Sequence, residues 1–104
     1  MYVKERMYKK ILCNDGFSVS IQAGTGKYCV PKTNDPNTAY EELELGYPSF
    51  NDPLIERYAE MPDKAPNTVY PYVPVQTVYL LLTKHGGVDS GECPMGVPVY
   101  GEPE

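Results

Sequence analysis

Three cysteines and a single histidine are the side chains of this sequence best suited to metal binding or nucleophilic catalysis: Cys13, Cys29, Cys93 and His85. They have the ligand types of a Cys3His zinc site, but their spacing differs from the paired knuckles of such sites. A Cys29–His85 nucleophile pair is conceivable, although no sequence feature brings these two residues together. We therefore predict no metal ion and no catalytic residue, two cysteines packed in the core, and a histidine that caps a helix.

The stretch Gly24-Thr25-Gly26-Lys27 partly matches a phosphate-binding loop. Such a loop has a glycine five residues before its Gly-Lys pair, and here that position is Ile21. Tyr28 stands where a serine or threonine would bind magnesium. The stretch is more typical of a hairpin turn, so we predict no cofactor.

The carboxylates Glu41, Glu42 and Glu44 are the other group with the chemistry for acid–base catalysis or cation binding. On a strand, Glu42 and Glu44 share one face and Glu41 lies on the other. A hydrolase needs one carboxylate in an apolar pocket that raises its pKa. These three indicate instead a solvated acidic edge, with recruitment of a partner protein as the alternative.

The charge of the chain is unevenly distributed around its formal net value of −5. Residues 1–10 carry a net +3, whereas residues 35–63 carry eight acids and one base. A basic surface of another protein would be attracted to this acidic segment, and nucleic acid would be repelled. The ten tyrosines of the chain suit a contact surface. The predicted partner-binding residues are Glu41, Glu42, Glu44, Asp52, Glu56, Glu60, Tyr40, Tyr58, Tyr70 and Tyr72.

Length and composition indicate one domain of 104 residues with a modest core. Eleven prolines and nine glycines favour short elements joined by turns. The odd cysteine count suggests reduced thiols in a cytosolic setting. No apolar segment follows the charged residues 1–10, and no run reaches the roughly 20 apolar residues of a membrane helix.

The strongest secondary-structure pattern predicts a helix that begins at Pro74 and ends at Gly86. Val75, Val78, Tyr79 and Leu82 recur at helical spacing, and Leu80 and Leu81 widen this face, so we expect cover on more than one side. A second, short helix is expected to begin at Asp52-Pro53 and to end at Pro62.

Strands are predicted from alternating polarity and turn residues. Residues 11–13, 17–23 and 28–30 should form an antiparallel meander, with Asn14-Asp15-Gly16 as its first turn. Residues 40–47 should form another strand, with a bulge at Gly46. Residues 69–73 should be extended, and Pro71 confines them to a sheet edge or to irregular structure.

These elements predict an α+β fold in which a small antiparallel sheet of about four strands packs against one long and one short helix. Residues 1–10 form a charged lead-in, residues 11–88 the single domain, and residues 89–104 an extended or disordered tail, because the last segment has turn signals and no period.

Several motifs of the chain resemble those of a group of small uncharacterised proteins encoded by tailed phages and prophages. The group shows a GFS-x-S-x-QA strand, a YC-x-P strand, a GYPS segment and a TVY-x-YVPV segment before a helix. Matching residues span about residues 14–88 and include Gly16, Phe17, Gln22, Tyr28, Cys29, Pro31, Pro48, Tyr70, Tyr72, His85 and Gly87. The sequence departs at Gln76, where the group often has glutamate. The resemblance implies a phage accessory protein and no particular activity.

We therefore expect a non-enzymatic, acidic protein of phage origin that binds a basic surface of a host protein in the cytoplasm of the infected cell. An inhibitor of a nucleic-acid-binding host enzyme or defence complex, similar to an anti-CRISPR protein, fits best because such partners have basic grooves. One alternative is a minor virion or assembly protein. The other is a small-ligand binder or enzyme that uses Ser18, Ser20, Gln22 and Tyr28 in a pocket on the sheet face.

Overall fold

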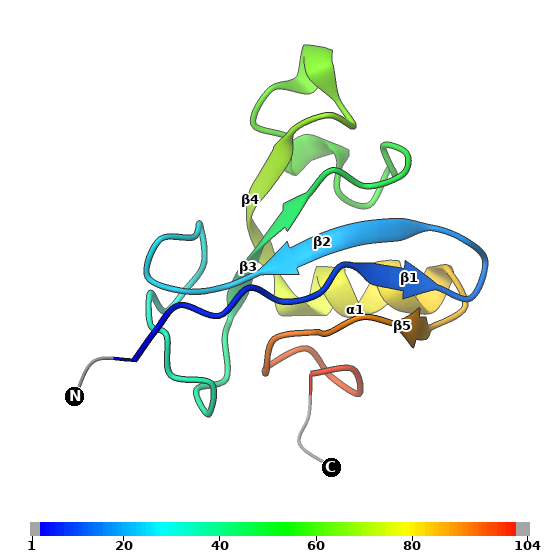
Figure 1. Ribbon diagram of the computed structural model, residues 1–104. Coiled ribbons are helices and arrows are strands. Elements are labelled where there is room, and N and C mark those ends of the chain that lie inside the picture. The colour runs from blue at the N-terminus through cyan, green and yellow to red at the C-terminus, as the bar shows by residue number, and fades with distance from the viewer. Residues whose placement is uncertain (1–2, 102–104) are drawn as a thin grey trace.

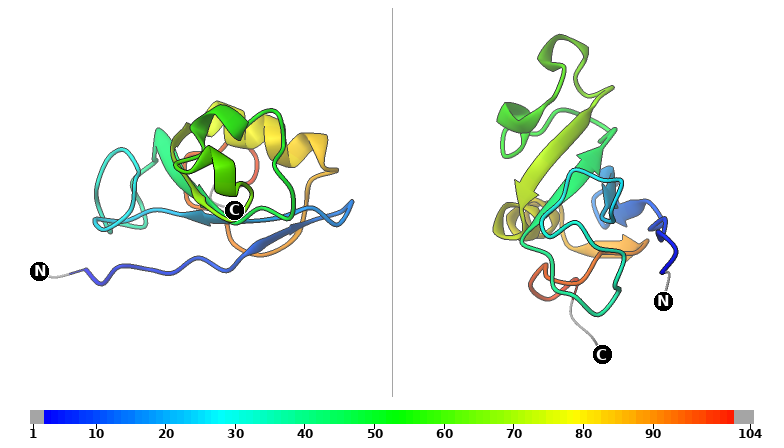
Figure 2. Two further views of the ribbon diagram at one scale, coloured as in Figure 1. Left: turned by 90° about the horizontal axis from the view of Figure 1, so that it is seen from above. Right: turned by 90° about the vertical axis from the view of Figure 1, so that its left-hand side faces the viewer.

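The computed structural model describes residues 3–101 and has an α+β fold, which confirms the predicted class. Five antiparallel strands form one sheet in the order β4-β3-β2-β1-β5, and the helix α1 lies on one of its faces (Figures 1 and 2). The strands are β1 (Ile11–Cys13), β2 (Ser18–Gln22), β3 (Glu42–Gly46), β4 (Val69–Pro74) and β5 (Val88–Ser90). The helices are α1 (Val75–Lys84) and the 3-10 helices η1 (Glu56–Tyr58) and η2 (Pro62–Lys64). None of the described helices is long and apolar enough to cross a membrane.

The β1–β2 hairpin forms where the sequence predicts it. Gly16 adopts a φ of 96°, and its N–H donates to the carbonyl of Cys13 at 3.0 Å. A left-handed φ is unfavourable for residues with a Cβ, which explains glycine at this turn. Beyond the turn Val19 and Ile21 are fully buried, while Ser18 and Ser20, which alternate with them, are half-buried. The alternation of β2 therefore places one face in the core.

The neighbour of β2 differs from the predicted one. Residues 28–30 form no strand and contribute a single bridge between Val30 and Glu42, whereas β2 pairs with β3. The N–H of Cys29 donates to the carbonyl of Lys27, and its thiol bonds the main chain of Gly24. These local bonds keep the segment coiled, so the predicted three-strand meander is wrong and β3 takes its place.

Helix α1 lies within two residues of the predicted limits. It packs on the core and also contacts Tyr100 of the C-terminal segment, whose ring centroid is 6.0 Å from that of Tyr79, but the face that contains Leu80 is uncovered. Val78, Leu81 and Leu82 are fully buried, whereas Leu80 is 53% exposed. Leu80 is two residues from both Val78 and Leu82, which places it on the opposite side of the helix. Gly86, with a φ of 86°, ends the helix as predicted.

The predicted short helix after Asp52 is a turn followed by the 3-10 helix η1. The N–H groups of Tyr58 and Ala59 bond carbonyls three residues earlier, the 3-10 pattern. Asp52 caps this segment as expected, because its side chain accepts the N–H of Leu54 at 2.9 Å. With η2, residues 47–68 form a lobe that projects beyond the ends of β3 and β4 (Figure 1).

Strand β4 is an edge strand, as Pro71 predicts. Its pairing with β3 shifts between the pairs Leu43–Val73 and Leu45–Tyr70, so β4 has one extra residue there. The bulge therefore lies in β4 rather than at Gly46. Tyr72 occupies it with a φ of 54°.

Both terminal segments are packed against the domain over their described residues. The main chain of Tyr8 exchanges two hydrogen bonds with the side-chain amide of Gln22, at 2.9 and 2.7 Å. Val97 is fully buried, and the N–H of Tyr40 donates to the carbonyl of Met95. Residues 3–10 and 89–101 are therefore ordered parts of the fold, which corrects the expected lead-in and tail. The remaining residues of both segments lie outside the described range.

Candidate partner-binding surface

Two of the three carboxylates of residues 41–44, those of Glu42 and Glu44, belong to β3, and Glu41 immediately precedes the strand. Glu42 and Glu44 are half-buried and alternate with the core residues Leu43 and Leu45, so they lie on the face opposite α1. Glu41 is exposed, and its carbonyl accepts the N–H of Val75 at the start of the helix. Glu42 and Glu44 therefore share one face of β3, whereas Glu41 lies outside the strand.

Two tyrosines are fixed beside Glu44. The N–H of Tyr28 donates to Glu44 Oε1 at 3.0 Å, and the carbonyl of Tyr28 accepts the N–H of Tyr72 at 3.1 Å. The two ring centroids are 5.8 Å apart, and the residues are 43% and 39% exposed. We call this pair the tyrosine platform. Lys32 lies above it, with Nζ 5.7 Å from the Tyr28 centroid and 5.3 Å from that of Tyr72.

The lobe supplies the rest of the predicted surface. Glu56 and Glu60 are exposed, and Tyr58 is half-buried. Arg57 lies over the Tyr58 ring and donates to its hydroxyl at 3.1 Å. Two of the predicted carboxylates therefore face solvent here, next to a base that is already engaged by a tyrosine.

Three of the predicted partner-binding residues are buried and do not belong to this surface. The hydroxyl of Tyr40 donates to the carbonyl of Thr33 at 2.7 Å, and burial raises the pKa of Tyr40 to about 12. Tyr70 is fully buried and donates to Asn51 at 2.8 Å. Asp52 is also fully buried. The polar group of each side chain has a hydrogen-bond partner within the protein, as buried polar groups generally do.

Asp52 lies at the centre of an ionic cluster in which Asp52 and His85 are buried, whereas the side chains of Lys84 and Asp15 are 47% and 48% exposed. His85 Nε2 is 2.8 Å from Asp52 Oδ2, and Lys84 Nζ is 3.0 Å from the same oxygen. The other ring nitrogen of His85 is 2.7 Å from Asp15 Oδ2. The imidazole also stacks on Phe17, with centroids 4.0 Å apart. The cluster joins the β1–β2 turn, the start of the lobe and the end of α1.

These contacts shift the pKa of both carboxyl groups. Desolvation by burial raises the pKa of Asp52, but hydrogen bonds from Leu54, His85 and Lys84 outweigh it and hold the pKa below its usual value. For Asp15, the backbone N–H of Phe17 and then the His85 side chain lower the pKa. Both carboxylates are therefore ionised where ordinary aspartates begin to protonate.

The cysteines do not join the histidine. Both ring nitrogens of His85 face carboxylates, and the Cys29 thiol contacts Gly24, so the two residues form no nucleophile–base pair. Burial raises the pKa of Cys13 to about 11 and that of Cys93 to about 12, which keeps both thiols protonated near neutral pH. Within residues 3–101, no three His, Cys, Asp or Glu side chains are grouped so as to hold a metal ion.

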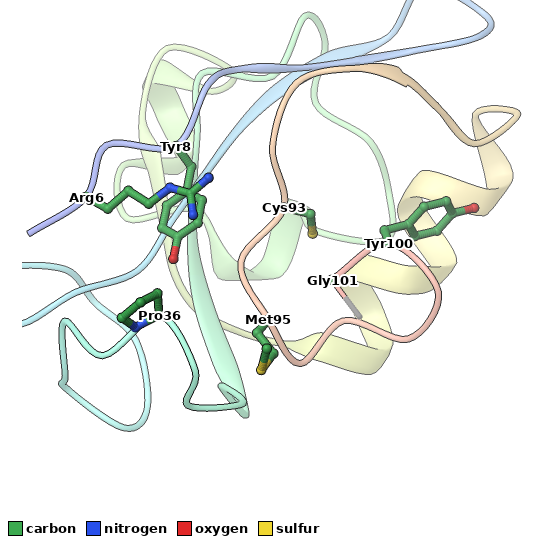
Figure 3. A pocket seen from close by; sticks show the side chains of 7 residues that line it. All are labelled: Arg6, Tyr8, Pro36, Cys93, Met95, Tyr100 and Gly101. Atoms are coloured by element: carbon green, nitrogen blue, oxygen red, sulfur yellow. The ribbon is translucent and has the colours of Figure 1, made fainter. Parts of the chain in front are cut away.

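A shallow hollow of about 170 Å³ lies between the N-terminal segment and the C-terminal segment (Figure 3). Arg6 and Tyr8 line one side, and Cys93, Met95 and Tyr100 line another. Arg6 lies 4.5 Å from the Tyr8 ring centroid and also pairs with Glu92 at 2.7 Å. None of the glutamates of β3 and the lobe lines the hollow. None of Ser18, Ser20, Gln22 and Tyr28, the residues considered for a ligand pocket, lines it.

Sequence reasoning missed the contribution of Tyr28 and Lys32 to the surface. Both lie in a coiled segment, where no periodicity indicates which way a side chain faces. The ionic cluster was missed for a different reason, since Asp15 and Asp52 are far from His85 in the sequence. Their roles as turn and capping residues were the only local signals.

In comparisons with known proteins, no protein-family model, no curated protein and no solved structure matched the chain.

Proposed function

We propose that this protein is a non-enzymatic binding protein that docks an acidic flank on a basic surface of a partner protein inside a phage-infected cell. The acidic flank comprises Glu41, Glu42, Glu44, Glu56 and Glu60, with Tyr58 and Tyr72 beside them. The partner class that suits it best is a nucleic-acid-binding host enzyme or defence complex. Such a partner has a groove of lysine and arginine side chains that attracts concentrated negative charge.

This proposal is based on the negative charges of the acidic flank, which no neighbouring cation among residues 3–101 neutralises. Four acids outside the flank are paired: Glu5 with Lys27, Glu92 with Arg6, Asp52 with Lys84 and His85, and Asp15 with His85. Asp35, Asp63 and Asp89 form no salt bridge with a described residue. Among the described residues, none of the five glutamates of the acidic flank forms a salt bridge. Three of them are exposed and two are half-buried. A partner's cations would therefore gain attraction without first breaking an internal ion pair.

The test is affinity capture from host lysate followed by quantitative binding of the recovered partner. One variant combines Glu42→Gln, Glu56→Gln and Glu60→Gln, which keeps side-chain size and removes three negative charges. The matched control combines Asp89→Lys and Ser90→Lys, which changes the net charge equally on β5, at the opposite edge of the sheet. Both control positions are exposed.

We expect the flank variant to weaken binding by about 5- to 30-fold, because each exposed ion pair contributes roughly 0.2–1 kcal/mol. The control should stay within about twofold of the wild type, and nucleic acid should compete for the same partner. Equal losses in the two variants would show that only net charge matters. Recovery of the chain as a stoichiometric part of purified virions, with no host partner, would favour the structural alternative.

A further inference from the structure

The tyrosine platform is held in place by an unfavourable backbone conformation. Tyr72 has a φ of 54°, in the left-handed region that bulky residues rarely adopt. The conformation turns its N–H out of the β4 ladder and onto the carbonyl of Tyr28 at 3.1 Å. A bulge of this kind re-aims a side chain. Here it fixes an exposed ring beside the ring of Tyr28 rather than in the core.

The platform already holds a cation. The ammonium group of Lys32 lies within 6 Å of both ring centroids, the range of cation–π attraction. It also donates to the carbonyl of Lys27 at 2.7 Å. Lys32 itself is exposed, so its ammonium can move into water when a competing cation arrives.

Carboxylates lie at the edge of the platform. Glu44 accepts the N–H of Tyr28, and Glu42 projects from the same face of β3. An arginine side chain matches this combination, because its planar guanidinium stacks on aromatic rings and its N–H groups bond carboxylates in pairs. An ammonium group can also lie over the rings, but it cannot form the paired hydrogen bonds of a planar guanidinium group.

We infer that the tyrosine platform is a binding site for an arginine side chain of the partner protein. The guanidinium group replaces the Lys32 ammonium over the rings of Tyr28 and Tyr72 and donates to Glu42 and Glu44. This inference rests on the proposed function and names the side chain that the acidic flank recognises. The two rings are already side by side, and Glu44 is already fixed next to them by the N–H of Tyr28.

The test is NMR titration of the full-length protein with N-acetyl-arginine amide, and with the lysine and citrulline amides as matched probes. Citrulline keeps the shape of arginine but has no charge. We expect arginine to shift the signals of Tyr28 and Tyr72, lysine to bind several-fold more weakly, and citrulline to cause no shift at these positions. Lys32→Met should strengthen arginine binding, because it removes the resident cation.

Two substitutions establish where the probe binds. Tyr72→Leu should weaken arginine binding about tenfold, whereas Tyr72→Phe should retain it, because the ring and not the hydroxyl carries the attraction. Tyr47→Leu is the control, since Tyr47 is also an exposed tyrosine with a positive φ, 48°. Its arginine binding should equal that of the wild type. The dispersion of the amide spectrum verifies that each variant is folded.

Equal shifts with citrulline and arginine, or unchanged arginine binding by Tyr72→Leu, would overturn the inference. The proposed function fails separately. If the flank variant lost partner affinity while Tyr72→Leu kept it, the result would support recognition through the acidic flank and would refute the arginine site. If partner affinity were insensitive to the flank variant, the proposed function would fall whatever the outcome of the arginine titration.

Discussion

His85 Nε2 lies 2.8 Å from Oδ2 of Asp52, a carboxylate that is fully buried. The second ring nitrogen meets Asp15, so one imidazole links the first hairpin turn to the start of the lobe. The sequence separation of these residues is large: His85 follows Asp15 by 70 positions and Asp52 by 33. Main-chain hydrogen bonds already join the β1–β2 turn to the end of α1, with the N–H of Asp15 donating to the carbonyl of His85 at 3.2 Å, and the cluster adds the start of the lobe to this junction.

Removal of the Asp52 charge should be strongly destabilising. Asp52→Asn leaves Lys84 and His85 without their shared carboxylate. Because the Lys84 side chain is 47% exposed, the expected cost is that of losing hydrogen bonds to a buried charged group, about 1.5–3 kcal/mol. Urea denaturation monitored by circular dichroism gives the free energy of unfolding. The control Asp89→Asn removes an exposed charge on β5 and should change stability by less than about 0.5 kcal/mol. Equal stabilities of the two variants would contradict a structural role for the cluster.

The same cluster makes stability depend on pH in the acidic range. The pKa values of Asp15 and Asp52 are lowered in the folded state. As pH falls past the ordinary aspartate pKa of about 3.9, these two residues therefore bind protons in the unfolded chain before they do so in the folded chain. Their contribution is complete above that value and is lost as pH falls through the lowered, folded-state pKa. Urea midpoints between pH 6 and pH 2 should therefore decline in this window. The decline should be shallower in Asp52→Asn, and a parallel decline would refute the assignment.

Leu81 lies on the buried side of α1 and Leu80 on its exposed face, so truncation of these two adjacent leucines should reduce stability unequally. Leu81→Ala should lower the free energy of unfolding by about 2–5 kcal/mol, because it leaves a cavity in the core. Leu80→Ala should cost less than about 1 kcal/mol, since Leu80 is 53% exposed. The two variants have the same composition and the same helix propensity change. Chemical denaturation compares them directly, and similar losses would mean that α1 is covered on both sides.

The packing of the C-terminal segment is testable at Gly96. A Cβ atom at Gly96 would clash with the carbonyl oxygen of Tyr40, and the φ of Gly96 is 121°. Gly16 is the matched control, because its φ of 96° is also left-handed but a Cβ there meets nothing within 4 Å. Gly96→Ala should speed hydrogen exchange at the Tyr40 amide, which bonds the carbonyl of Met95.

In Gly16→Ala, backbone strain should lower the free energy of unfolding by roughly 1–2 kcal/mol. The Tyr40 amide should remain protected from hydrogen exchange relative to its neighbours. Faster exchange at Tyr40 in both variants alike would show that the close contact at Gly96 does not hold the segment.

Local patterns were enough to predict the elements whose stabilising contacts are close in sequence. The alternation in β2, the glycine at position 16 and the spacing of apolar residues in α1 each encode one buried face. The edge position of β4 followed from Pro71, which has no N–H to donate to a neighbouring strand. These features depend on backbone chemistry and periodicity, which are visible in a single sequence.

What the sequence did not reveal depends on contacts between distant segments. β3 rather than residues 28–30 pairs with β2, because the short coil after β2 is closed by its own main-chain and thiol bonds. The C-terminal segment packs through glycines and main-chain hydrogen bonds. Contacts of this kind leave no periodic pattern in the sequence, so the sequence did not predict the packing. Asp52 looked like a surface acid because its partners Lys84 and His85 are distant in sequence. The tyrosine platform required a bulge, which no local pattern indicated.

The most direct measurement of the proposed function is the salt dependence of the dissociation constant of the partner complex, from about 50 to 500 mM salt. Binding through the acidic flank predicts a steep loss of affinity with salt for the wild type. It also predicts a clearly shallower dependence for the variant that combines Glu42→Gln, Glu56→Gln and Glu60→Gln. The same slope for the wild type and this variant would contradict recognition through the acidic flank.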